Sequence, residues 1–263
     1  MIDCSSIIKI NRKKKIKLLL SQIILLVLTL LLWEALAYLN LIDDFLFSRP
    51  SKIFSLLVQY IKTNEIFKHI YISVLETILG IIIGTLLGIL IAIILWSSNK
   101  LSKLLEPFLV MLNALPKTAL APIMIIWAGT GVSGIVVVAI SILIVITIIS
   151  AYNYFINVDE EKIKMLKSYN ASKVQIFMKL VLPHNLINII NIIKINIGMS
   201  WVGVIVGEFL VSRAGIGYLI MYGGQVFRLD LVMMGVFVLA ICAYLMWKAI
   251  DILEKYFIKR RGN

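Results

Sequence analysis

The chain has 263 residues, of which 61% are apolar and only 15% are charged, and its mean hydropathy is +1.00. An ordinary globular domain is about half apolar and about a quarter charged, so this composition excludes a water-soluble domain. The apolar residues lie in runs of about twenty or more, separated by short charged stretches, which is typical of a chain that crosses a bilayer several times. Two cysteines, Cys4 and Cys242, provide neither a disulfide framework nor a metal-binding spacing.

Six apolar segments are each long enough to cross a hydrocarbon core, for which about 20 helical residues are needed. We interpret all six as helices, because an open strand cannot satisfy its backbone polar groups in lipid. They are residues 18–39, 74–96, 104–129, 132–156, 186–211 and 231–250. The sequence thus predicts an all-α, polytopic membrane protein, with residues 1–17 as a basic cytoplasmic leader and residues 18–263 as the transmembrane domain.

The basic residues lie mostly on one side of these segments. With the N-terminus in the cytoplasm, the inward-facing stretches contain 17 of the 26 Lys and Arg residues, and the outward-facing stretches contain six. This asymmetry follows the positive-inside rule and places both termini in the cytoplasm. We expect the first segment to be retained, because its apolar run is longer than the core of a usual signal peptide.

A short amphipathic helix is expected between the first two spans. Pro50 can begin it, and apolar residues then recur at helical spacing against Lys52, Gln59 and Lys62. The apolar residues are Ile53, Phe54, Leu57, Tyr60 and Ile61. We expect this helix to lie along the membrane surface and to lead into the second span.

Glycines line one face of two predicted spans. Gly80, Gly84 and Gly88 recur every four residues in the second span, and Gly203 and Gly207 repeat that spacing in the fifth. A helix face without side chains lets another helix approach closely. We therefore assign these glycines to helix packing within the subunit.

The third predicted span contains three prolines, Pro107, Pro116 and Pro122. Each removes a backbone hydrogen-bond donor from the helix. A span of this kind is expected to be bent or partly unwound where neighbouring protein can compensate. Whether the break serves packing alone or also transport is left open by the sequence.

The polar stretch between the fourth and fifth spans predicts two short helices joined by a tight turn. Asp159 can cap the first helix, which has acids in its first turn and lysines later, as the helix dipole favours. Asn170 can end it, because Asn tolerates the left-handed conformation. Ser172 and Gln175 form a capping box that begins the second helix, and Pro183 is expected to end that helix.

This stretch, the 158–183 loop, carries an apolar face on its second helix. The face consists of Val174, Phe177, Met178 and Val181. An apolar stripe exposed to the cytoplasm indicates a protein partner, whereas the same stripe packed on the chain's own spans would be structural, and the pattern leaves both open. Nucleic acid is disfavoured, because three acids lie beside five lysines in a loop tied to the membrane at both ends.

The 158–183 loop resembles the EAA loop of ATP-binding-cassette (ABC) importer permeases. That pattern is Glu-Ala-Ala, three residues, Gly, nine residues, Ile, one residue and Leu-Pro. Here Leu182-Pro183 match the end, Leu180 occupies the Ile position, and Asn170 occupies the Gly position. Lys164-Met165-Leu166 stand where Glu-Ala-Ala is expected. Asn170 preserves the turn, but Lys164 does not preserve the charge of the acid.

Further motifs resemble the branch of that family that imports nitrate, sulfonates, taurine, bicarbonate or thiamine precursors. The similarity runs from about residue 48 to the last span. Its residues are Leu115-Pro116, Ala121-Pro122, Trp127 to Gly131, Asn170-Ala171-Ser172, Gln175, Phe177, Leu182-Pro183, Lys194, Gly198, Trp201, Glu208 and Gly215 to Ile220.

The resemblance implies a pore-forming subunit that is not itself an enzyme. In such systems two permeases pair, here as a homodimer, two cytoplasmic ATPases dock on the loops, and an extracytoplasmic binding protein delivers the substrate. ATP and Mg would be bound by the ATPase, with no cofactor or metal in this chain, which lacks a Gly-x4-Gly-Lys-Ser/Thr phosphate loop. The implied coupling residues are Lys164, Leu166, Asn170, Ala171, Ser172, Val174, Gln175, Phe177, Leu182 and Pro183.

The candidate residues of the translocation path are Lys117, Trp201 and Glu208. An ionisable group within a span costs about 2.5–3.5 kcal/mol at mid-bilayer on insertion scales, so such groups are candidates for function. Glu208 could instead cap neighbouring backbone, and Lys117 could reach water. Lys194 is expected to extend toward the cytoplasmic side.

We therefore expect an inner-membrane permease subunit of an ATP-driven importer for a small solute, an anion such as a sulfonate, taurine or nitrate, or a thiamine precursor. The alternative is a secondary transporter or channel that works without an ATPase. Internal inverted repeats would favour that alternative, and the sequence shows none. A membrane-embedded enzyme is less favoured, because His69 and His184 stand alone and no paired acids lie within a span.

Overall fold

The computed structural model describes residues 4–261, and it describes side chains for residues 16–256. Every regular element in these residues is helical. The elements are α1 (Cys4–Tyr38), α2 (Asp44–Phe47), α3 (Pro50–Lys62), α4 (Glu65–Ser97), α5 (Asn99–Ala114), α6 (Lys117–Ala128), α7 (Val132–Ile156), α8 (Glu160–Ser168), α9 (Lys173–Ile176), the π-helical turn η1 (Phe177–Val181), α10 (Leu182–His184), α11 (Leu186–Val211), α12 (Ile216–Gln225) and α13 (Leu229–Arg261).

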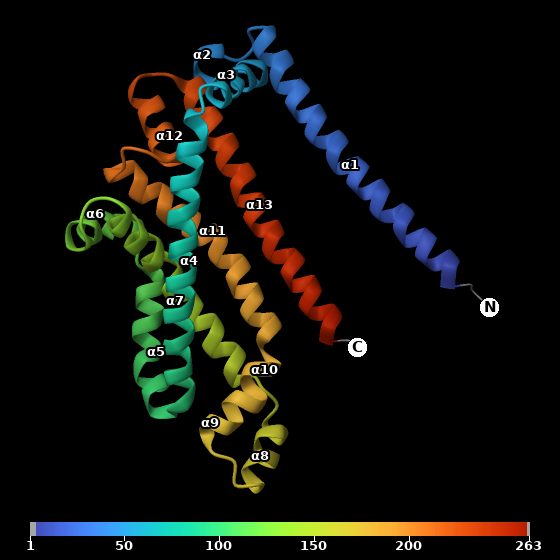
Figure 1. The fold of residues 1–263 in the computed structure, drawn as a ribbon, viewed down its shortest axis with the longest axis vertical. Helices are drawn as coiled ribbons and strands as arrows, with labels where there is room; N and C mark the ends of the chain where they lie inside the picture. The colour runs from blue at the N-terminus through green and yellow to red at the C-terminus, as the bar shows by residue number, and fades with distance from the viewer. Residues whose placement is uncertain (1–3, 262–263) are drawn as a thin grey trace.

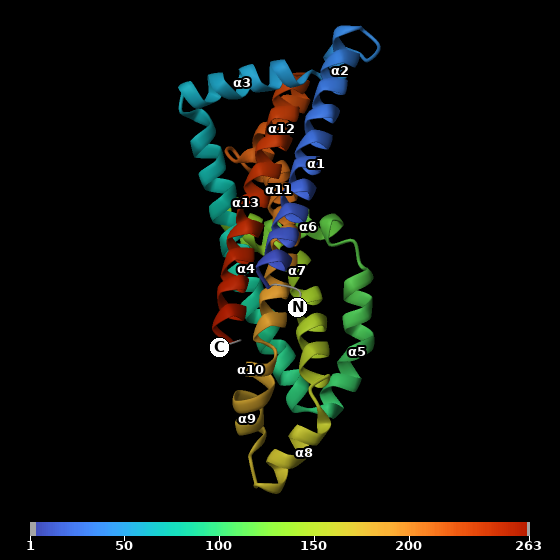
Figure 2. The ribbon, with the colours of Figure 1, turned by 90° about the vertical axis from the view of Figure 1, so that its right-hand side faces the viewer.

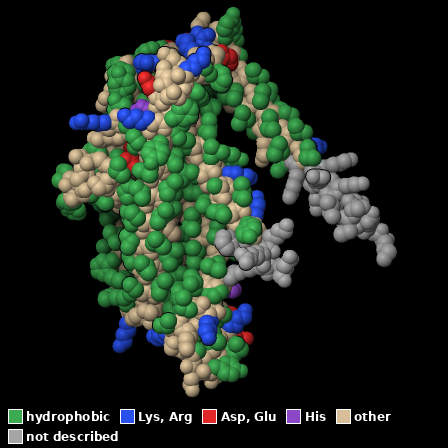
Figure 3. All heavy atoms as spheres, viewed as in Figure 1, with side chains coloured by type: hydrophobic (Ala, Val, Ile, Leu, Met, Phe, Trp, Pro, Cys, Tyr) green, Lys and Arg blue, Asp and Glu red, His purple; other side chains and the backbone are tan. Residues whose placement is uncertain are grey.

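Within the described residues, five helices are long and apolar enough to cross a membrane, and the bent pair α5–α6 would make a sixth span. The five are α1, α4, α7, α11 and α13, which correspond to five of the six predicted segments. Figure 1 shows α4, α7, α11 and α13 running side by side, with α8 and α9 projecting from one end of the bundle. The flank of the bundle is covered with apolar side chains, and charged side chains gather toward its two ends (Figure 3). The predicted all-α, polytopic architecture is confirmed.

The third predicted span is two helices that meet at 97°. The break falls at Leu115 and Pro116, between α5 and α6. Pro116 has no N–H to continue the helix, and the residue before a proline is pushed into extended backbone, as Leu115 is with ψ of 134°. The other two prolines, Pro107 and Pro122, are accommodated inside α5 and α6. The predicted bend is confirmed.

The centre of the bundle is the contact of α7 with α4 on one side and with α11 on the other. Both glycine series face α7: a Cβ on Gly84 would lie 2.4 Å from a methyl carbon of Leu143, and one on Gly203 would lie 2.4 Å from the Cα of Ala139. A Cβ on Gly80, Gly88 or Gly207 would likewise meet another helix at 3.0 Å or less. The assignment of these glycines to packing within the subunit agrees with this geometry.

Helix α1 diverges from the bundle and contacts α3 at the end where α2 and α3 lie (Figure 1). It is one continuous helix from Cys4, so no break marks the predicted boundary between leader and span at residue 17. The side chains of most of the leader, residues 1–15, lie outside the described part of the chain. At its other end Glu34 accepts hydrogen bonds from the backbone N–H of Ser51 at 3.0 Å and from its hydroxyl at 2.8 Å. Glu34 thereby caps the first turn of α3, whose own N-cap residue, Arg49, makes no side-chain cap.

The predicted amphipathic helix is α3, and Pro50 lies in its first turn. Figure 2 shows it lying across the end of the bundle, nearly perpendicular to the long helices. Its buried residues are Ile53 and Leu56, whereas Phe54, expected on the apolar face, is 67% exposed. The packed face is therefore narrower than the sequence pattern suggested.

Candidate functional site

The 158–183 loop forms the two short helices and the turn expected from its sequence. Asp159 caps α8 by accepting the N–H of Glu161 at 2.9 Å. Asn170 adopts the left-handed conformation, with φ of 55°, directly after that helix. Ser172 and Gln175 form the predicted capping box at the start of α9. The loop thus has a defined shape that its own sequence specifies.

The apolar face of the second loop helix is divided between the protein interior and its surface. Phe177 is 5% exposed, and its ring centroid lies 5.2 Å from that of Trp96 on α4 and 5.2 Å from that of Phe155 on α7. Val174 and Met178 are instead 71% and 57% exposed. The two alternatives left open by the sequence therefore apply to different residues: Phe177 packs on the chain's own spans, whereas Val174 and Met178 are exposed at the surface. Phe177 anchors the loop, and Val174 and Met178 are left free on its surface.

Several other residues of the 158–183 loop attach it to the bundle, whereas Lys164 does not. Leu166, Ala171 and Leu182 pack against the cluster around Phe177. The ammonium group of Lys173 donates a hydrogen bond to the carbonyl of Ser97 at 2.9 Å, which ties the loop to the end of α4. Lys164 lies on the surface and forms an ion pair with Glu160 at 3.1 Å, four residues earlier in α8.

The second loop helix ends at His184, one residue after the predicted end at Pro183. The helical path continues through the π-helical turn η1 and then α10, and it reaches Asn185 at the start of α11. A proline cannot donate the ordinary helical hydrogen bond, and a local π-turn is one way in which a continuous helix adjusts its bonding pattern. The side chain of Asn185 donates to the carbonyl of Val181 at 3.0 Å and supports the junction.

Glu208 binds backbone, which is one of the two roles expected for it. Its carboxylate accepts the N–H groups of Gly217 and Tyr218, at 2.5 and 3.3 Å, in the first turn of α12. The hydroxyl of Ser73 on α4 donates to the same carboxylate at 2.5 Å. Nearby, His69 on α4 accepts the N–H of Gly215 at 2.9 Å and so contacts the segment that leads into α12.

The other path candidates lie apart from Glu208. Trp201 is buried in the hydrophobic core between α11 and its neighbours. Lys117 lies at the start of α6, next to the break, and its ammonium group donates to the carbonyl of Asn113 at 3.3 Å. The structure therefore does not bring the three predicted residues together in one site.

Lys194 is paired with two acids of another helix, which the sequence analysis did not predict. Its side chain is only 15% exposed and forms ion pairs with Asp251, at 3.2 Å, and with Glu254, both on α13. An ammonium group in a span is stabilised when an acid of another helix meets it. Asp251 and Glu254 follow Lys194 by 57 and 60 positions, and the sequence alone could not predict contacts over such separations.

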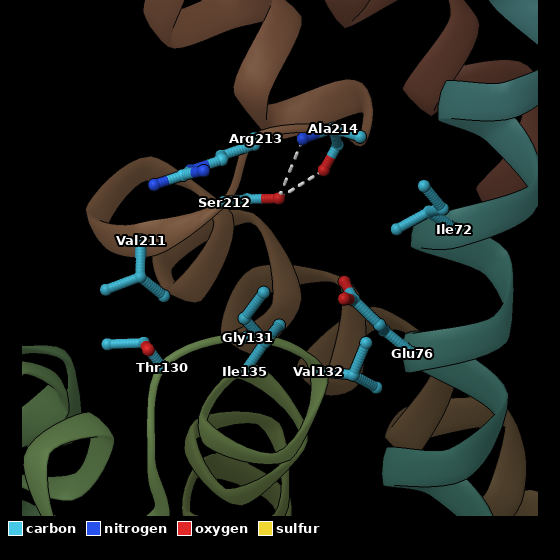
Figure 4. Close-up of a pocket in the computed structure, with 10 residues that line it drawn as sticks. All are labelled: Ile72, Glu76, Thr130, Gly131, Val132, Ile135, Val211, Ser212, Arg213 and Ala214. Atoms are coloured by element: carbon cyan, nitrogen blue, oxygen red, sulfur yellow. Dashed lines mark hydrogen bonds between the residues drawn. The ribbon is translucent and has the colours of Figure 1, made fainter.

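A pair of acids from different spans was missed by the sequence analysis. Glu76 on α4, 1% exposed, contacts the carboxyl group of Glu208 on α11. A solitary acid in an apolar run was the available signal, but its partner lies on another helix. Glu76 also lines a cavity of about 490 Å³, next to the segment that joins α11 to α12 (Figure 4). The other lining residues are Ile72, Thr130, Gly131, Val132, Ile135, Val211, Ser212, Arg213 and Ala214.

Residues 84–263 match the family described as binding-protein-dependent transport system inner membrane component. The chain belongs to this family. It is thus a permease subunit of an ABC importer, a multi-pass protein of the inner membrane without catalytic activity of its own. ATP is bound by a separate ATPase, and a binding protein presents the substrate. This membership decides against the secondary transporter or channel.

Several ABC permeases are similar over most of their length. A probable ABC transporter permease of Haemophilus influenzae is 28% identical over 93% of this chain and 98% of its own. Putative aliphatic sulfonates transport permeases SsuC of Bacillus subtilis and Escherichia coli are 27% identical over 88% of this chain and 84% of theirs, and 30% identical over 75% of both chains, respectively. The fold resembles that of the inward-facing MetNI methionine ABC transporter, with a TM-score of 0.58 and 17% identity over 76% of this chain and 97% of that chain.

Proposed function

We propose that this permease works as a homodimer that imports a small sulfonate, with both termini and the 158–183 loop in the cytoplasm and with the ATPase bound at Val174 and Met178. The observation that carries the proposal is the division of the loop helix. Phe177 fixes the loop to α4 and α7, while the two exposed apolar side chains next to it project from the end of the bundle. A surface of this kind supports docking, because exposed apolar groups on a fixed scaffold favour a partner.

The proposed orientation in the membrane is supported by the basic segments at the end of the bundle where the 158–183 loop lies. Figure 1 places the loop, the turn between α4 and α5 and the C-terminal end of α13 toward one end of the bundle. These segments carry much of the excess of Lys and Arg, which favours the cytoplasmic side. The cavity beside Glu76 and helix α12 would then face outward.

The homodimer is supported by the packing at the centre of one copy. Ala139, Leu143 and Thr147 of α7 are fully buried against the glycines of α4 and α11. No solute could pass between these helices without separating them, so a second copy would supply the other wall of the passage. Helix α6 has exposed apolar side chains that could contact the second copy, including Trp127, which is 82% exposed.

The substrate class is proposed from the relatives. Two of them are putative permeases for aliphatic sulfonates, and a third is the taurine transport permease TauC of Escherichia coli, which is 24% identical over 86% of this chain. A formylaminopyrimidine transport permease from Halalkalibacterium halodurans matches only 48% of this chain, so a thiamine precursor is the second choice.

The docking surface is tested by co-purification of the ATPase with tagged permease. We expect Val174→Asp and Met178→Asp together to reduce the recovered ATPase at least about tenfold, because a charge in a desolvated contact costs several kcal/mol. Phe67→Asp is the matched control, since Phe67 is 53% exposed on α4 at the other end of the bundle. Full recovery with the double variant would show that the ATPase binds elsewhere.

The substrate class is tested by uptake into proteoliposomes that contain permease, ATPase and binding protein. We expect ATP-dependent accumulation of labelled ethanesulfonate or taurine, and none of a formylaminopyrimidine. The copy number is read from the mass of the intact complex, where two permeases are expected. Uptake of the formylaminopyrimidine alone would refute the sulfonate assignment and leave the docking result intact.

A further inference from the structure

The cavity beside Glu76 has one acid in its wall and one base at its rim. Figure 4 shows Glu76 reaching in from α4 on one side, and Arg213 on the other side, in the segment between α11 and α12. No ion pair joins Arg213 to any side chain among residues 16–256 for which the structure describes contacts. The two groups therefore do not neutralise each other across the cavity.

Glu76 has bonding capacity that the protein leaves unused. One of its two oxygen atoms, Oε2, is buried without a hydrogen-bond partner. The carboxyl group of Glu208 beside it already accepts hydrogen bonds from Ser73, Gly217 and Tyr218. A buried acceptor without a partner is rare, and its position in a cavity wall indicates a ligand that donates hydrogen bonds.

Arg213 supplies the opposite chemistry at the rim. Its guanidinium group is exposed and has the planar donor geometry that suits an oxyanion. The hydroxyl of Thr130 and the backbone of Gly131 lie in the same wall. Gly131 has φ of 114°, and no atom lies within 4 Å of where its Cβ would be, so the wall is open there.

We propose that this cavity binds a small zwitterion, with its ammonium group against Glu76 and its sulfonate against Arg213. The inference rests on the proposed import of sulfonates and narrows it to aminosulfonates of the taurine type. A plain alkanesulfonate would satisfy Arg213 but leave Glu76 without a donor. A cavity of about 490 Å³ accommodates a ligand of this size together with water.

Binding of labelled taurine and labelled ethanesulfonate to the purified permease–ATPase complex, without binding protein, tests the proposal. We expect taurine to bind more tightly than ethanesulfonate. Glu76→Gln should weaken taurine binding about tenfold or more and change ethanesulfonate binding less than about threefold, since hydrogen bonds to charged groups carry effects of this size. Arg213→Gln should weaken both ligands by about tenfold or more.

The controls separate the site from the fold and from the substrate assignment. Glu65→Gln removes an exposed acid from the same helix, Lys62→Gln removes an exposed base from the same end of the bundle, and neither should change binding. Arg213 is exposed, so its variant tests the site even if Glu76→Gln impairs folding. Equal affinity for both ligands, or unchanged taurine binding in either site variant, would overturn the zwitterion site. If neither ligand binds or is transported, the proposed sulfonate substrate fails as well.

Discussion

The carboxylate of Glu208 on α11 accepts the backbone N–H of Gly217 at 2.5 Å, which ties the start of α12 to the end of α11. The same turn is held from α4, because Ser73 accepts the N–H of Ile216 at 2.7 Å while it donates to Glu208. Three segments far apart in the sequence are therefore joined by one buried acid and one hydroxyl group. The first turn of a helix has unpaired N–H groups, and here a neighbouring span supplies their acceptor.

Removal of that acceptor should loosen α12. We expect Glu208→Ala to lower the free energy of unfolding by about 1–3 kcal/mol, because the buried donors of Gly217 and Ser73 lose their partner. Hydrogen exchange of residues 216–225 and thermal unfolding in detergent measure the effect. Glu65→Ala, an exposed acid at the start of α4, is the control. Unchanged exchange in α12 would show that Ser73 alone holds the turn.

Two glycines of α11 should respond oppositely to a methyl group. A Cβ on Gly203 would lie 2.4 Å from the Cα of Ala139, whereas nothing lies within 4 Å of a Cβ on Gly198. We expect Gly203→Ala to destabilise by about 1–3 kcal/mol through overpacking. Gly198→Ala should be neutral or stabilise by up to about 1 kcal/mol, since Ala favours the helix. Thermal unfolding measures the stability of both variants. Equal stabilities of Gly203→Ala and Gly198→Ala would contradict the close contact of α7 and α11.

Asn170 should tolerate Gly but not Val. Its φ of 55° lies in the left-handed region, where a β-branched residue is disfavoured by about 1–2 kcal/mol and Gly is not. We expect Asn170→Val to increase proteolytic cleavage between α8 and α9, and Asn170→Gly to leave it near the wild-type rate. Cleavage of Asn170→Val at the wild-type rate would show that the turn does not depend on this conformation.

Lys194 and Glu254 should be energetically coupled. Their ion pair is largely shielded from water, and Asp251 beside them has a second partner in Lys255. In a double-mutant cycle of Lys194→Met and Glu254→Gln we expect a coupling free energy of about 1–2 kcal/mol. Lys164 and Glu160, an exposed pair within α8, should give about 0.5 kcal/mol or less by the same measurement. A coupling energy near zero for the first pair would mean that Glu254 adds nothing to the ion pair that Lys194 makes with Asp251.

The corner between α2 and α3 should weaken in acid. A hydrogen bond from Lys52 and the guanidinium group of Arg49, at 2.9 Å, hold the pKa of Asp44 below its usual value. A lowered pKa in the folded state gives stability that is present above the unfolded value of about 3.9 and is lost as the pH falls through the folded value. Hydrogen exchange of residues 44–52 should therefore increase below about pH 4 in the wild type. Asp44→Asn should show that faster exchange already at pH 7, and a pH response retained in this variant would assign it to another group.

The sequence predicted the local features well and the contacts between helices poorly. Some features depend only on a few neighbouring residues, so the local sequence predicts them. These are the capping box at Ser172, the left-handed turn at Asn170 and the break at Pro116. The burial of Phe177, the partners of Lys194 and the meeting of Glu76 with Glu208 depend on which faces of distant helices come together. Periodicity marks an apolar face, but it cannot say whether the chain itself or a partner covers it.

The close connection of the second loop helix to α11, with only Asn185 between them, has a mechanical consequence. The π-helical turn and Pro183 carry the backbone from Val174 to Asn185 without a flexible linker, and α11 starts there. A displacement applied at Val174 and Met178 would be passed to α11 through the single turn residue Asn185 and would reach Glu208, 34 positions after Val174, and the turn it holds. With the ATPase bound at Val174 and Met178 as proposed, we expect the insertion of a few glycines at Asn185 to uncouple transport from ATP hydrolysis while both subunits remain assembled.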